Sequence, residues 1–525
     1  MPLHPPISMS RATLIGALED AQQQSQVFDL AVIGGGATGL GVALDAASRG
    51  LKVVLVEAND FAKGTSSRST KLVHGGVRYL AQGNMGLVRE ALHERSTLLA
   101  NAPHIAQPLA FVVPAFRWWE SAFYGLGLKM YDALAGRSSL GRTRFLSRSE
   151  TQHALPTVRT QGLRGGVQYW DGQFNDAQLA IALARTAARE GALILNHMKA
   201  LSLRYTEGHV SGVSCEDVLT QQTYDIQARC VVNATGVWVD ALRAQDGQTR
   251  HMVAPSQGVH IVVDAKFLPG QQALMVPKTS DGRVLFAVPW LGKVILGTTD
   301  TPREDLAMEP LAFEEEVDFI LREAARYLQV PPQRSDVKSI WVGLRPLVKP
   351  LDNEVSNTKG LSREHTVMVS PSGLVTVTGG KWTTYRAMAE DVLAHCADRG
   401  LLPRQASVTV HFPLVGAEPT TIKPLPLSAA QGLHSYGSEQ AWVAQLPGHD
   451  VELAEGLTEA MVRFAARCEF AVKVEDVLAR RSRLLFLDAA KAMQLAETVG
   501  RILSEETGMD PDVAGFIQLA AQYQL

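Results

Sequence analysis

The first sixty residues show the hydrophobic pattern of one complete β-α-β unit. The short apolar run Leu30 to Ile33 predicts a buried parallel strand. The segment Ala37 to Arg49 predicts a helix, and Leu51 to Val56 predicts a second strand. Strands joined through a helix in this way are the building block of dinucleotide-binding domains, so a nucleotide-binding sheet is expected to begin here.

The pattern further along the chain predicts two more structural parts. Segments of alternating hydrophobicity between residues 200 and 232 predict an antiparallel meander, and residues 253 to 301 predict further strands. The expected fold class is therefore α/β plus α+β. We expect a discontinuous Rossmann-like domain from residues 1–85, 160–250 and 360–399, an antiparallel-sheet substrate or cap domain from 86–159 and 251–359, and a C-terminal helical domain from 400–525.

Three glycines lie at the turn between the first strand and the helix and form the pattern G-x-G-x-x-G. Gly34 permits a tight turn, Gly36 lets the backbone approach a pyrophosphate, and Gly39 lets the helix pack on the strand. The helix start then offers free N–H groups and the positive end of its dipole to phosphates. Glu57 follows at the end of the second strand, where its carboxylate can accept from ribose hydroxyls and would repel a 2′-phosphate. The sequence predicts a dinucleotide site that disfavours NADP.

The segment from 115 to 134 is unusually aromatic and allows two interpretations. Its large apolar residues recur at helical spacing: Trp119, Phe123, Leu126 and Met130, with Trp118 and Tyr131 beside them. One interpretation is a helix that lies in a membrane interface, where tryptophan and tyrosine are favoured and Arg117 and Lys129 can reach the headgroups. The other is an ordinary core helix. The sequence leaves both open.

Composition narrows the class of protein. The chain has 525 residues, of which 46% are hydrophobic and 20% charged, and its net charge is −3, which gives no electrostatic reason to expect nucleic acid. Its four cysteines are far apart, so neither a disulfide framework nor a metal site is predicted, and a reducing compartment is expected. No secretory signal and no membrane-spanning segment is predicted.

Three segments far apart in the sequence favour a flavin over a nicotinamide cofactor. They are the hydroxyl-rich stretch Phe61 to Leu80, the turn Ala234 to Gly236 after the meander, and the glycine pair before Lys381 that opens a helix. A nicotinamide domain is normally continuous in sequence. A dinucleotide site assembled from separated segments is typical of two-domain flavoproteins.

Several longer motifs identify a family. The sequence resembles the FAD-dependent, respiratory-chain glycerol-3-phosphate dehydrogenases of the bacterial type, within the wider D-amino-acid oxidase-like flavoproteins. The resemblance covers nearly the whole chain, and its motifs are GGGATGLGVALDAASRG, TSSRSTKLVHGGVRYL, GLRPLV followed by SREH, TGGKWTTYR and RCEFAVKVEDVLARRSRLLFLD.

The resemblance implies a non-covalently bound FAD and the residues that hold it. The hydroxyl-rich loop matches the family segment along the diphosphate and isoalloxazine. The expected FAD-binding residues are Gly34, Gly36, Thr38, Gly39, Glu57, Thr65, Ser66, Ser67, Ser69, Lys71, His74, Gly75, Gly76, Ala234, Thr235, Gly236, Gly380, Lys381 and Thr383. The helix opened at Lys381 is expected to point its positive end at the flavin.

The resemblance also implies an anionic-substrate site. The matching positions are Arg78, Tyr79, His260, Arg345, Arg363 and Lys381. A phosphate monoester is nearly dianionic at neutral pH, so two arginine forks and a lysine suit it better than they suit a simple carboxylate. His260 is the expected catalytic base, with His74 or water as alternatives, and Arg345 is expected to stabilise charge on the reacting oxygen.

The implied activity is oxidation of sn-glycerol 3-phosphate to dihydroxyacetone phosphate, with hydride transfer to FAD and electrons passed to membrane quinone. The resemblance places such a protein in the cytoplasm, peripheral on the cytoplasmic face of the inner membrane, and a homodimer is left open. Two alternatives remain. One is an oxygen-using glycerophosphate oxidase or another hydroxy-acid or amine oxidase of the same fold, and the other is a flavin-binding protein without catalysis.

Overall fold

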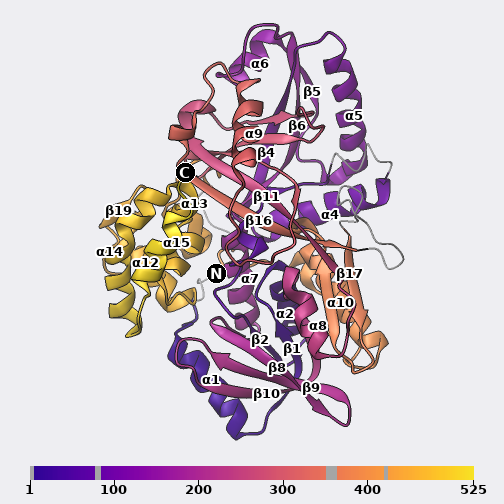
Figure 1. The fold of residues 1–525 in the computed structure, drawn as a ribbon, viewed down its shortest axis with the longest axis vertical. Helices are drawn as coiled ribbons and strands as arrows, with labels where there is room; N and C mark the ends of the chain where they lie inside the picture. The colour runs from indigo at the N-terminus through magenta and orange to yellow at the C-terminus, as the bar shows by residue number, and fades with distance from the viewer. Residues whose placement is uncertain (1–4, 77–83, 350–363, 419–423) are drawn as a thin grey trace.

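The computed structural model describes residues 5–76, 84–349, 364–418 and 424–525. Figure 1 shows three parts: a lower part that contains β1, β2 and β10, an upper part that contains β4, β6 and β11, and a helical part at the side that ends at the C-terminus. The C-terminal part contacts both of the others.

The lower part is built on an eight-stranded sheet whose central strands are parallel. β1 pairs in parallel with β2 and β10, β10 with β18, and β2 with β7. The order is β17-β18-β10-β1-β2-β7, with the hairpin of β8 and β9 attached to β10. The strands are β1 (Val27–Ile33), β2 (Val53–Val56), β7 (Leu193–Leu195), β8 (Met198–Thr206), β9 (His209–Asp217), β10 (Thr223–Asn233), β17 (His365–Val369) and β18 (Val375–Gly379). Their parallel direction brings the ends of β1, β2, β10 and β18 to one edge.

Helices cover this sheet and are packed closely where their residues are small. The helices are α1 (Arg11–Gln23), α2 (Ala37–Ser48), α7 (Asp176–Arg189), α8 (Val239–Gln245) and α10 (Tyr385–Asp398). A Cβ at Gly41 of α2 would lie 2.9 Å from the Tyr385 ring of α10, so this glycine sets the spacing of the two helices. Ser10 caps α1 by accepting from the Thr13 N–H.

The upper part is built on a ten-stranded, mainly antiparallel sheet. Its strands are β3 (Leu72–Val73), β4 (Ala106–Ala115), β5 (Arg144–Ser147), β6 (Gly165–Phe174), β11 (Val253–Asp264), β12 (Ala273–Val276), β13 (Leu285–Trp290), β14 (Lys293–Gly297), β15 (Thr301–Pro302) and β16 (Ser339–Val348). Its helices are α4 (Met85–Asn101), α5 (Glu120–Ala135), α6 (Arg148–Ala154) and α9 (Glu314–Ala325). Alternate residues of β11 and β16 face a core beneath α9, which buries Val259, Ile261 and Val342.

The C-terminal part is a helical domain with its own core. Its elements are η9 (Leu433–Glu439), α11 (Gln440–Val443), β19 (Glu452–Ala454), β20 (Leu457–Thr458), α12 (Glu459–Cys468), the π-helix η10 (Asp476–Arg481), α13 (Leu484–Leu487), α14 (Ala489–Thr507) and α15 (Val513–Ala521). This core includes Trp341 and Val262 of the upper sheet, so the domain is packed onto β11 and β16.

The predicted fold class is confirmed. Two strands, however, belong to a different sheet from the one that the expected domain boundaries assign to them. β6 belongs to the predicted segment 160–250, but it pairs with β4 along its whole length in the upper sheet. β3 belongs to the predicted segment 1–85, but it pairs with the end of β6. The reason is that the loop after β2 leaves the parallel sheet and adds a short edge strand to the second sheet. The chain therefore passes between the two sheets near residues 71 and 175.

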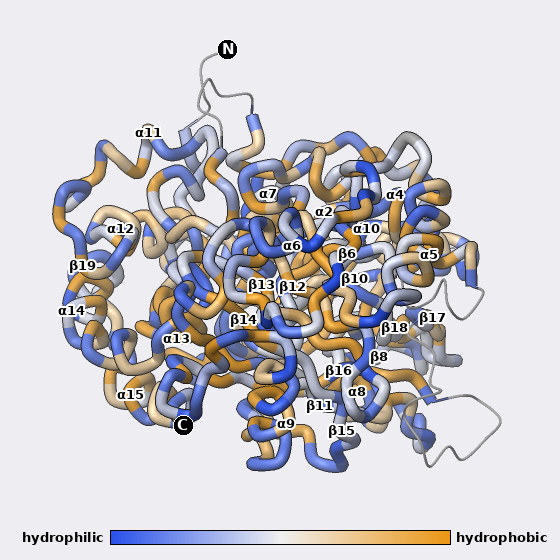
Figure 2. The backbone as a smooth tube through the Cα atoms, turned by 90° about the horizontal axis from the view of Figure 1, so that it is seen from above, coloured by the Kyte–Doolittle hydropathy of each residue, from blue (hydrophilic) through white to orange (hydrophobic). Residues whose placement is uncertain are grey.

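Hydropathy follows this layering. Figure 2 shows long hydrophobic stretches in β10 and β12–β14, in the interior of the view, and frequent hydrophilic stretches at its periphery. Among the helices of the described residues, none combines the length and the apolar character that crossing a membrane requires.

The aromatic segment forms α5, and its apolar stripe faces outward. Figure 1 shows α5 on the outer side of the upper part. Trp118 is 81% exposed, Phe123 67% and Leu126 66%, while the opposite face of α5 buries Leu128 and Tyr131. The core interpretation of the stripe is therefore wrong.

A buried ionic cluster fastens the C-terminal domain to the lower part. Asp60, which follows β2, accepts from Arg480 and Arg481 of η10, and Asn196 donates to the same carboxylate at 3.1 Å. Asp476 binds His197 and Arg480 beside it. Asp60, His197 and Asp476 lie close enough together to resemble a metal site, but the two arginines supply the positive charge, and we assign no metal here.

Asp60→Asn should lower the stability of the protein markedly, because it removes the charge that two buried guanidinium groups share. Loss of one partner from a buried ionic cluster typically costs about 3–5 kcal/mol. The thermal midpoint of the purified protein measures the change. Asp318→Asn is the matched control, because the pair of Asp318 with Arg334 is exposed to solvent and should contribute little to stability. Equal midpoints for the two variants would contradict the assignment.

Candidate active site

The turn after β1 leaves no room for side chains. Gly34 has a φ of +112°, and a Cβ there would overlap the Ala234 carbonyl at the end of β10. A Cβ at Gly39 would overlap the Gly34 carbonyl. The turn is thus pressed against its own helix on one side and against the neighbouring strand on the other. Only glycine fits these two positions, which agrees with the roles predicted for them.

The hydroxyl-rich loop reaches back to this turn. Ser66 Oγ accepts from the Ala37 N–H at 3.0 Å and so satisfies one of the free donors at the start of α2. Trp382, in the short helix η7 (Trp382–Thr384), donates from its ring to the Ser66 carbonyl at 2.8 Å. Thr65 Oγ1 donates to the Leu344 carbonyl of β16 at 2.6 Å. The loop, the helix start and the glycine-pair segment therefore meet at one place.

The two other predicted segments also converge on the edge of the sheet. Thr378 donates to the Gly236 carbonyl at 3.1 Å, which joins the end of β18 to the turn after β10. Thr383 donates to the His74 carbonyl at 3.4 Å. Gly380 has a φ of +79°, so a residue with a side chain would be strained there. The three segments that the sequence analysis singled out therefore lie together in the fold, as predicted.

Glu57 lies where a ribose contact is predicted. Its two carboxylate oxygens accept from the Gly35 N–H at 2.7 Å and the Asn59 N–H at 2.9 Å. Burial raises the pKa of Glu57, and these two donors act in the opposite direction. Each carboxylate oxygen keeps a further lone pair for a hydroxyl donor. The glycine turn, the start of α2 and this carboxylate together fit the adenosine diphosphate half of a dinucleotide, and Gly34, Gly36 and Glu57 would hold it.

His260 lies on β11 and is almost fully buried. Its Nε2 lies 2.9 Å from Thr70 Oγ1, and its ring stacks on that of Trp341, its cross-strand neighbour, at 5.3 Å. Its Nδ1 is buried without a hydrogen-bond partner among the described residues. Burial, followed by the charges of Lys71 and Arg345, holds the pKa of His260 well below its usual 6.5. The imidazole is therefore neutral at pH 7.

Arg345 lies on β16 beside His260 and is held by the chain around it. Its guanidinium pairs with Asp300 at 3.1 Å and donates to the Thr299 carbonyl at 3.0 Å. A side chain at Gly258 would overlap the guanidinium, so a glycine on β11 makes the room for it. Arg345 remains about one-fifth exposed, so a ligand can reach it.

The remaining predicted residues divide into three groups. Arg78, Tyr79 and Arg363 lie outside the described residues. His74, Lys381 and Thr383 lie in the segments that converge beside the loop. Ser69 and Lys71 bond to Asp176 within the protein, so the cofactor contacts expected of them remain predictions.

Comparison with known proteins identifies the family. A family model described as FAD dependent oxidoreductase matches residues 29–386, and one described as the C-terminal domain of alpha-glycerophosphate oxidase matches residues 407–514. The chain is 41% identical over 524 residues to a mitochondrial glycerol-3-phosphate dehydrogenase of Homo sapiens, which covers 93% of this chain and 72% of that protein. The chain belongs to the FAD-dependent glycerol-3-phosphate dehydrogenase family. The predicted family is thereby confirmed.

Other members and solved structures agree with this family. A mitochondrial glycerol-3-phosphate dehydrogenase of Arabidopsis thaliana is 42% identical over 534 residues, which covers 93% of this chain and 84% of that protein. The solved glycerol-3-phosphate dehydrogenase of Bacillus halodurans, complexed with FAD, is 31% identical with a TM-score of 0.75, over 98% of this chain and 96% of that one. A glycine oxidase from Geobacillus kaustophilus, at 22% identity and a TM-score of 0.53 over 74% of this chain and 98% of that one, shares the fold alone.

The structure adds to this family site a buried array that the sequence analysis missed. Tyr131 of α5 accepts from the Gly75 N–H at 2.8 Å and donates to Asp171 at 2.8 Å, and Arg95 of α4 pairs with Asp171 at 2.9 Å. All of these side chains are buried. Tyrosine in an apolar stripe gives no sequence signal for this role, because the pairing depends on where β6 places Asp171.

Tyr131→Phe should loosen the loop at Gly75, because it leaves a buried N–H without an acceptor, at a cost of about 1–3 kcal/mol. Hydrogen exchange of a peptide that contains Gly75 should become faster, and the thermal midpoint should fall. Tyr169→Phe is the control, since the hydroxyl of that buried tyrosine contacts only the weak acceptor Met275 sulfur. An unchanged exchange rate in Tyr131→Phe would show that this array does not hold the loop at Gly75.

Proposed function

We propose that this protein oxidises the C2 hydroxyl of sn-glycerol 3-phosphate to dihydroxyacetone phosphate, with FAD as its non-covalently bound cofactor. FAD supplies the hydride acceptor when bound. The observation that carries the proposal is His260, a neutral buried imidazole whose Nδ1 has no hydrogen-bond partner in the described part of the chain and on which the charge of Arg345 acts. A neutral imidazole can take the proton of a hydroxyl group, and the guanidinium can stabilise the negative charge that develops on the oxygen.

The protein orients and deprotonates the substrate in this scheme. Thr70 Oγ1 contacts Nε2 of His260 at 2.9 Å and so orients the imidazole that is proposed to take the hydroxyl proton. Arg345, held by Asp300 and the Thr299 carbonyl, is proposed to stabilise the negative charge on the reacting oxygen. Lys381, together with Arg78 and Arg363, is proposed to bind the phosphate. Positioning of C2 for transfer then follows from contacts at both ends of the substrate.

Anaerobic addition of sn-glycerol 3-phosphate should bleach the oxidised flavin spectrum of the purified protein. Arg345→Ala should raise KM and lower kcat, at a cost of about 2–5 kcal/mol in kcat/KM if the guanidinium pairs a buried anion. Arg334→Ala, which removes an exposed arginine paired with Glu314 and Asp318 of α9, should leave both constants unchanged. A protein that keeps its FAD but is not bleached would contradict the substrate.

Quinone is the proposed electron acceptor, and oxygen is the alternative. One observation favours oxygen: the family model that matches the C-terminal domain is named for alpha-glycerophosphate oxidase. Aerobic turnover with a soluble quinone analogue decides between the two. Peroxide formed in proportion to substrate would assign the oxidase function, whereas turnover that requires the quinone and yields no peroxide supports the dehydrogenase.

The outward face of α5 is the proposed contact with the cytoplasmic face of the inner membrane. Its exposed apolar residues are Trp118, Trp119, Phe123, Leu126 and Met130, with Phe145 beside them. Lys129 lies 4.9 Å from the Phe145 ring centroid, so a cation flanks the apolar surface. Aromatic side chains bordered by basic ones are suited to the headgroup region of an anionic bilayer. A homodimer remains compatible with this arrangement.

The double variant Trp118→Ser, Phe123→Ser should bind anionic liposomes more weakly, because it removes two of the most exposed aromatic groups of the face. Turnover with a soluble dye should be retained. Co-sedimentation with vesicles measures the binding. The double variant Val330→Ser, Val408→Ser removes two exposed apolar residues elsewhere and should bind as the unmodified protein does. Equal binding of all three proteins to vesicles would contradict the proposal that α5 contacts the membrane.

A further inference from the structure

Asp176, the first residue of α7, receives donors from two separate domains. Its side chain is fully buried, and it accepts from the Ser69 hydroxyl at 2.7 Å and from Lys71 Nζ at 2.7 Å. The guanidinium of Arg483, from the C-terminal domain, lies 3.4 Å from its other oxygen. The hydroxyl-rich loop, a helix of the FAD-binding part and the C-terminal domain thus meet at one carboxylate.

Lys71 and Arg483 also converge on the loop backbone. Lys71 Nζ and an Arg483 terminal nitrogen each donate to the Ser67 carbonyl at 2.7 Å. Both residues have left-handed backbone conformations, with φ of +62° at Lys71 and +60° at Arg483. Such conformations are uncommon outside glycine and persist where the surroundings determine them. Two of them at one carboxylate indicate that this junction is built for a particular loop geometry.

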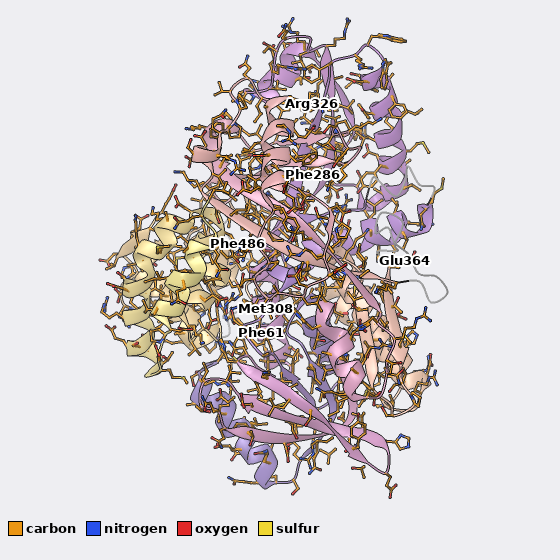
Figure 3. All side chains as sticks on the ribbon, in the orientation of Figure 1. Phe61, Phe286, Met308, Arg326, Glu364 and Phe486 are labelled. Atoms are coloured by element: carbon orange, nitrogen blue, oxygen red, sulfur yellow. The ribbon has the colours of Figure 1, made fainter. Side chains whose placement is uncertain are left out.

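Arg483 is placed by features that belong to the C-terminal domain. It follows the π-helix η10, an irregularity that often marks functional positions, and its other terminal nitrogen donates to the Ala479 carbonyl at 2.6 Å. Its guanidinium lies 4.0 Å from the centroid of the Phe486 ring. Figure 3 shows Phe486 between the C-terminal helices and the upper sheet, where its ring contacts Trp341 at 5.2 Å. Arg483 therefore has little freedom to move apart from its domain.

Other residues of the loop held in this way contact the proposed active site. Residues 67, 69 and 71 are fastened to Asp176 and Arg483. Two neighbouring residues make different contacts: Ser66, just before them, accepts from the Ala37 N–H at the start of α2, and Thr70, between residues 69 and 71, bonds to His260. A shift of the fastened residues would move both of these contacts, because they share a continuous stretch of backbone.

We propose that Arg483 is a positioning residue of the FAD site, and that the C-terminal domain holds the loop 65–76 in the geometry that the cofactor and His260 require. This gives the C-terminal domain a task in cofactor retention. The proposal rests on the proposed function only in that FAD contacts this loop. It does not depend on which alcohol is oxidised.

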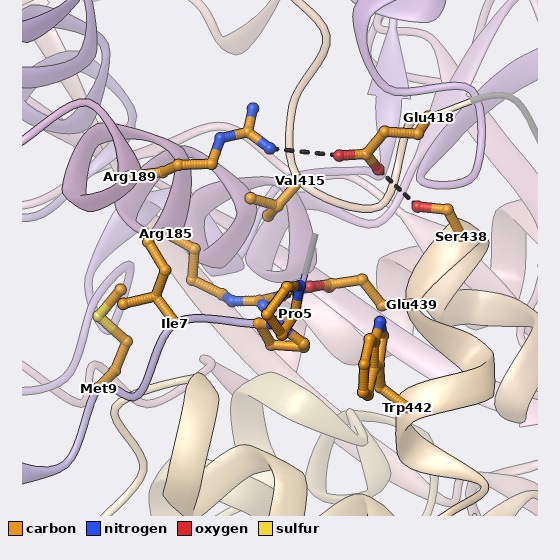
Figure 4. A pocket seen from close by; sticks show the side chains of 11 residues that line it. Pro5, Ile7, Met9, Arg185, Arg189, Val415, Glu418, Ser438, Glu439 and Trp442 are labelled. Atoms are coloured by element: carbon orange, nitrogen blue, oxygen red, sulfur yellow. Dashed lines mark hydrogen bonds and ion pairs between the residues drawn. The ribbon is translucent and has the colours of Figure 1, made fainter. Parts of the chain in front are cut away.

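Release of FAD from the holoenzyme tests the proposal without any substrate. The rise of flavin fluorescence after dilution gives the release rate. Arg483→Met should accelerate release by about tenfold or more, since it removes a charge-assisted hydrogen bond from the loop. Arg185→Met is the matched control. Figure 4 shows Arg185 of α7 with Glu439 of the C-terminal domain, another largely buried ion pair between the same two parts, at 2.6 Å. This control should release FAD at the rate of the unmodified protein.

Two outcomes would overturn the proposal: an unchanged release rate in Arg483→Met, or equal acceleration in both variants at a temperature where all proteins remain folded. Arg483→Lys keeps the positive charge but cannot reach Ala479, Ser67 and Asp176 as the planar guanidinium does. It should release FAD at an intermediate rate, and this milder variant serves if Arg483→Met does not fold. Failure of glycerol 3-phosphate to bleach the flavin would contradict the proposed substrate and leave the release rates interpretable.

Discussion

The carboxylate of Asp176 is the contact on which the arrangement around the site depends. One negative charge serves two buried cations there, and burial lowers the pKa of Lys71 to about 7 and that of Arg483 to about 10 despite the attraction of Asp176. Buried ionic groups of this kind are weak sources of stability, because desolvation offsets much of the attraction. Their geometry is strict, however, and a misplaced partner leaves a charge uncompensated. The cluster therefore fixes the register of the loop, while the surrounding apolar cores supply the stability.

The parallel sheet imposes the second constraint. The ends of β1, β2, β10 and β18 meet at one edge because the strands run in the same direction, although they come from residues 27 to 379 of the chain. A dinucleotide bound at this edge is held by segments that are distant in sequence and adjacent in space. Between these segments the chain builds the second sheet, whose strands β11 and β16 bring His260 and Arg345 toward the same edge.

The sequence predicts the parts of this site whose chemistry is local. The glycine turn, the helix that follows it and Glu57 are read directly from spacing and periodicity, and the longer motifs carry the family. The supporting residues are different. Asp176 begins an ordinary amphipathic helix, Arg483 stands among several arginines, and Thr70 is one hydroxyl in a loop of many. Their importance depends on which side of the loop each faces, which tertiary packing decides. The same holds for β3 and β6, which pair within the upper sheet although the expected boundaries assign both to the FAD-binding domain.

Helix α5 joins the surface of the molecule to its active site. One face exposes Trp118 and Phe123, and the other carries Tyr131, whose hydroxyl accepts from the Gly75 N–H in the loop. Tyr131 is in turn fixed by Asp171 and Arg95, so the helix cannot rotate without breaking a buried array. The helix thus carries a solvent-exposed apolar face on one side and a buried, hydrogen-bonded tyrosine on the other. Whatever covers the outer face of α5 therefore acts on a helix that is already bonded to the loop 65–76 at Gly75.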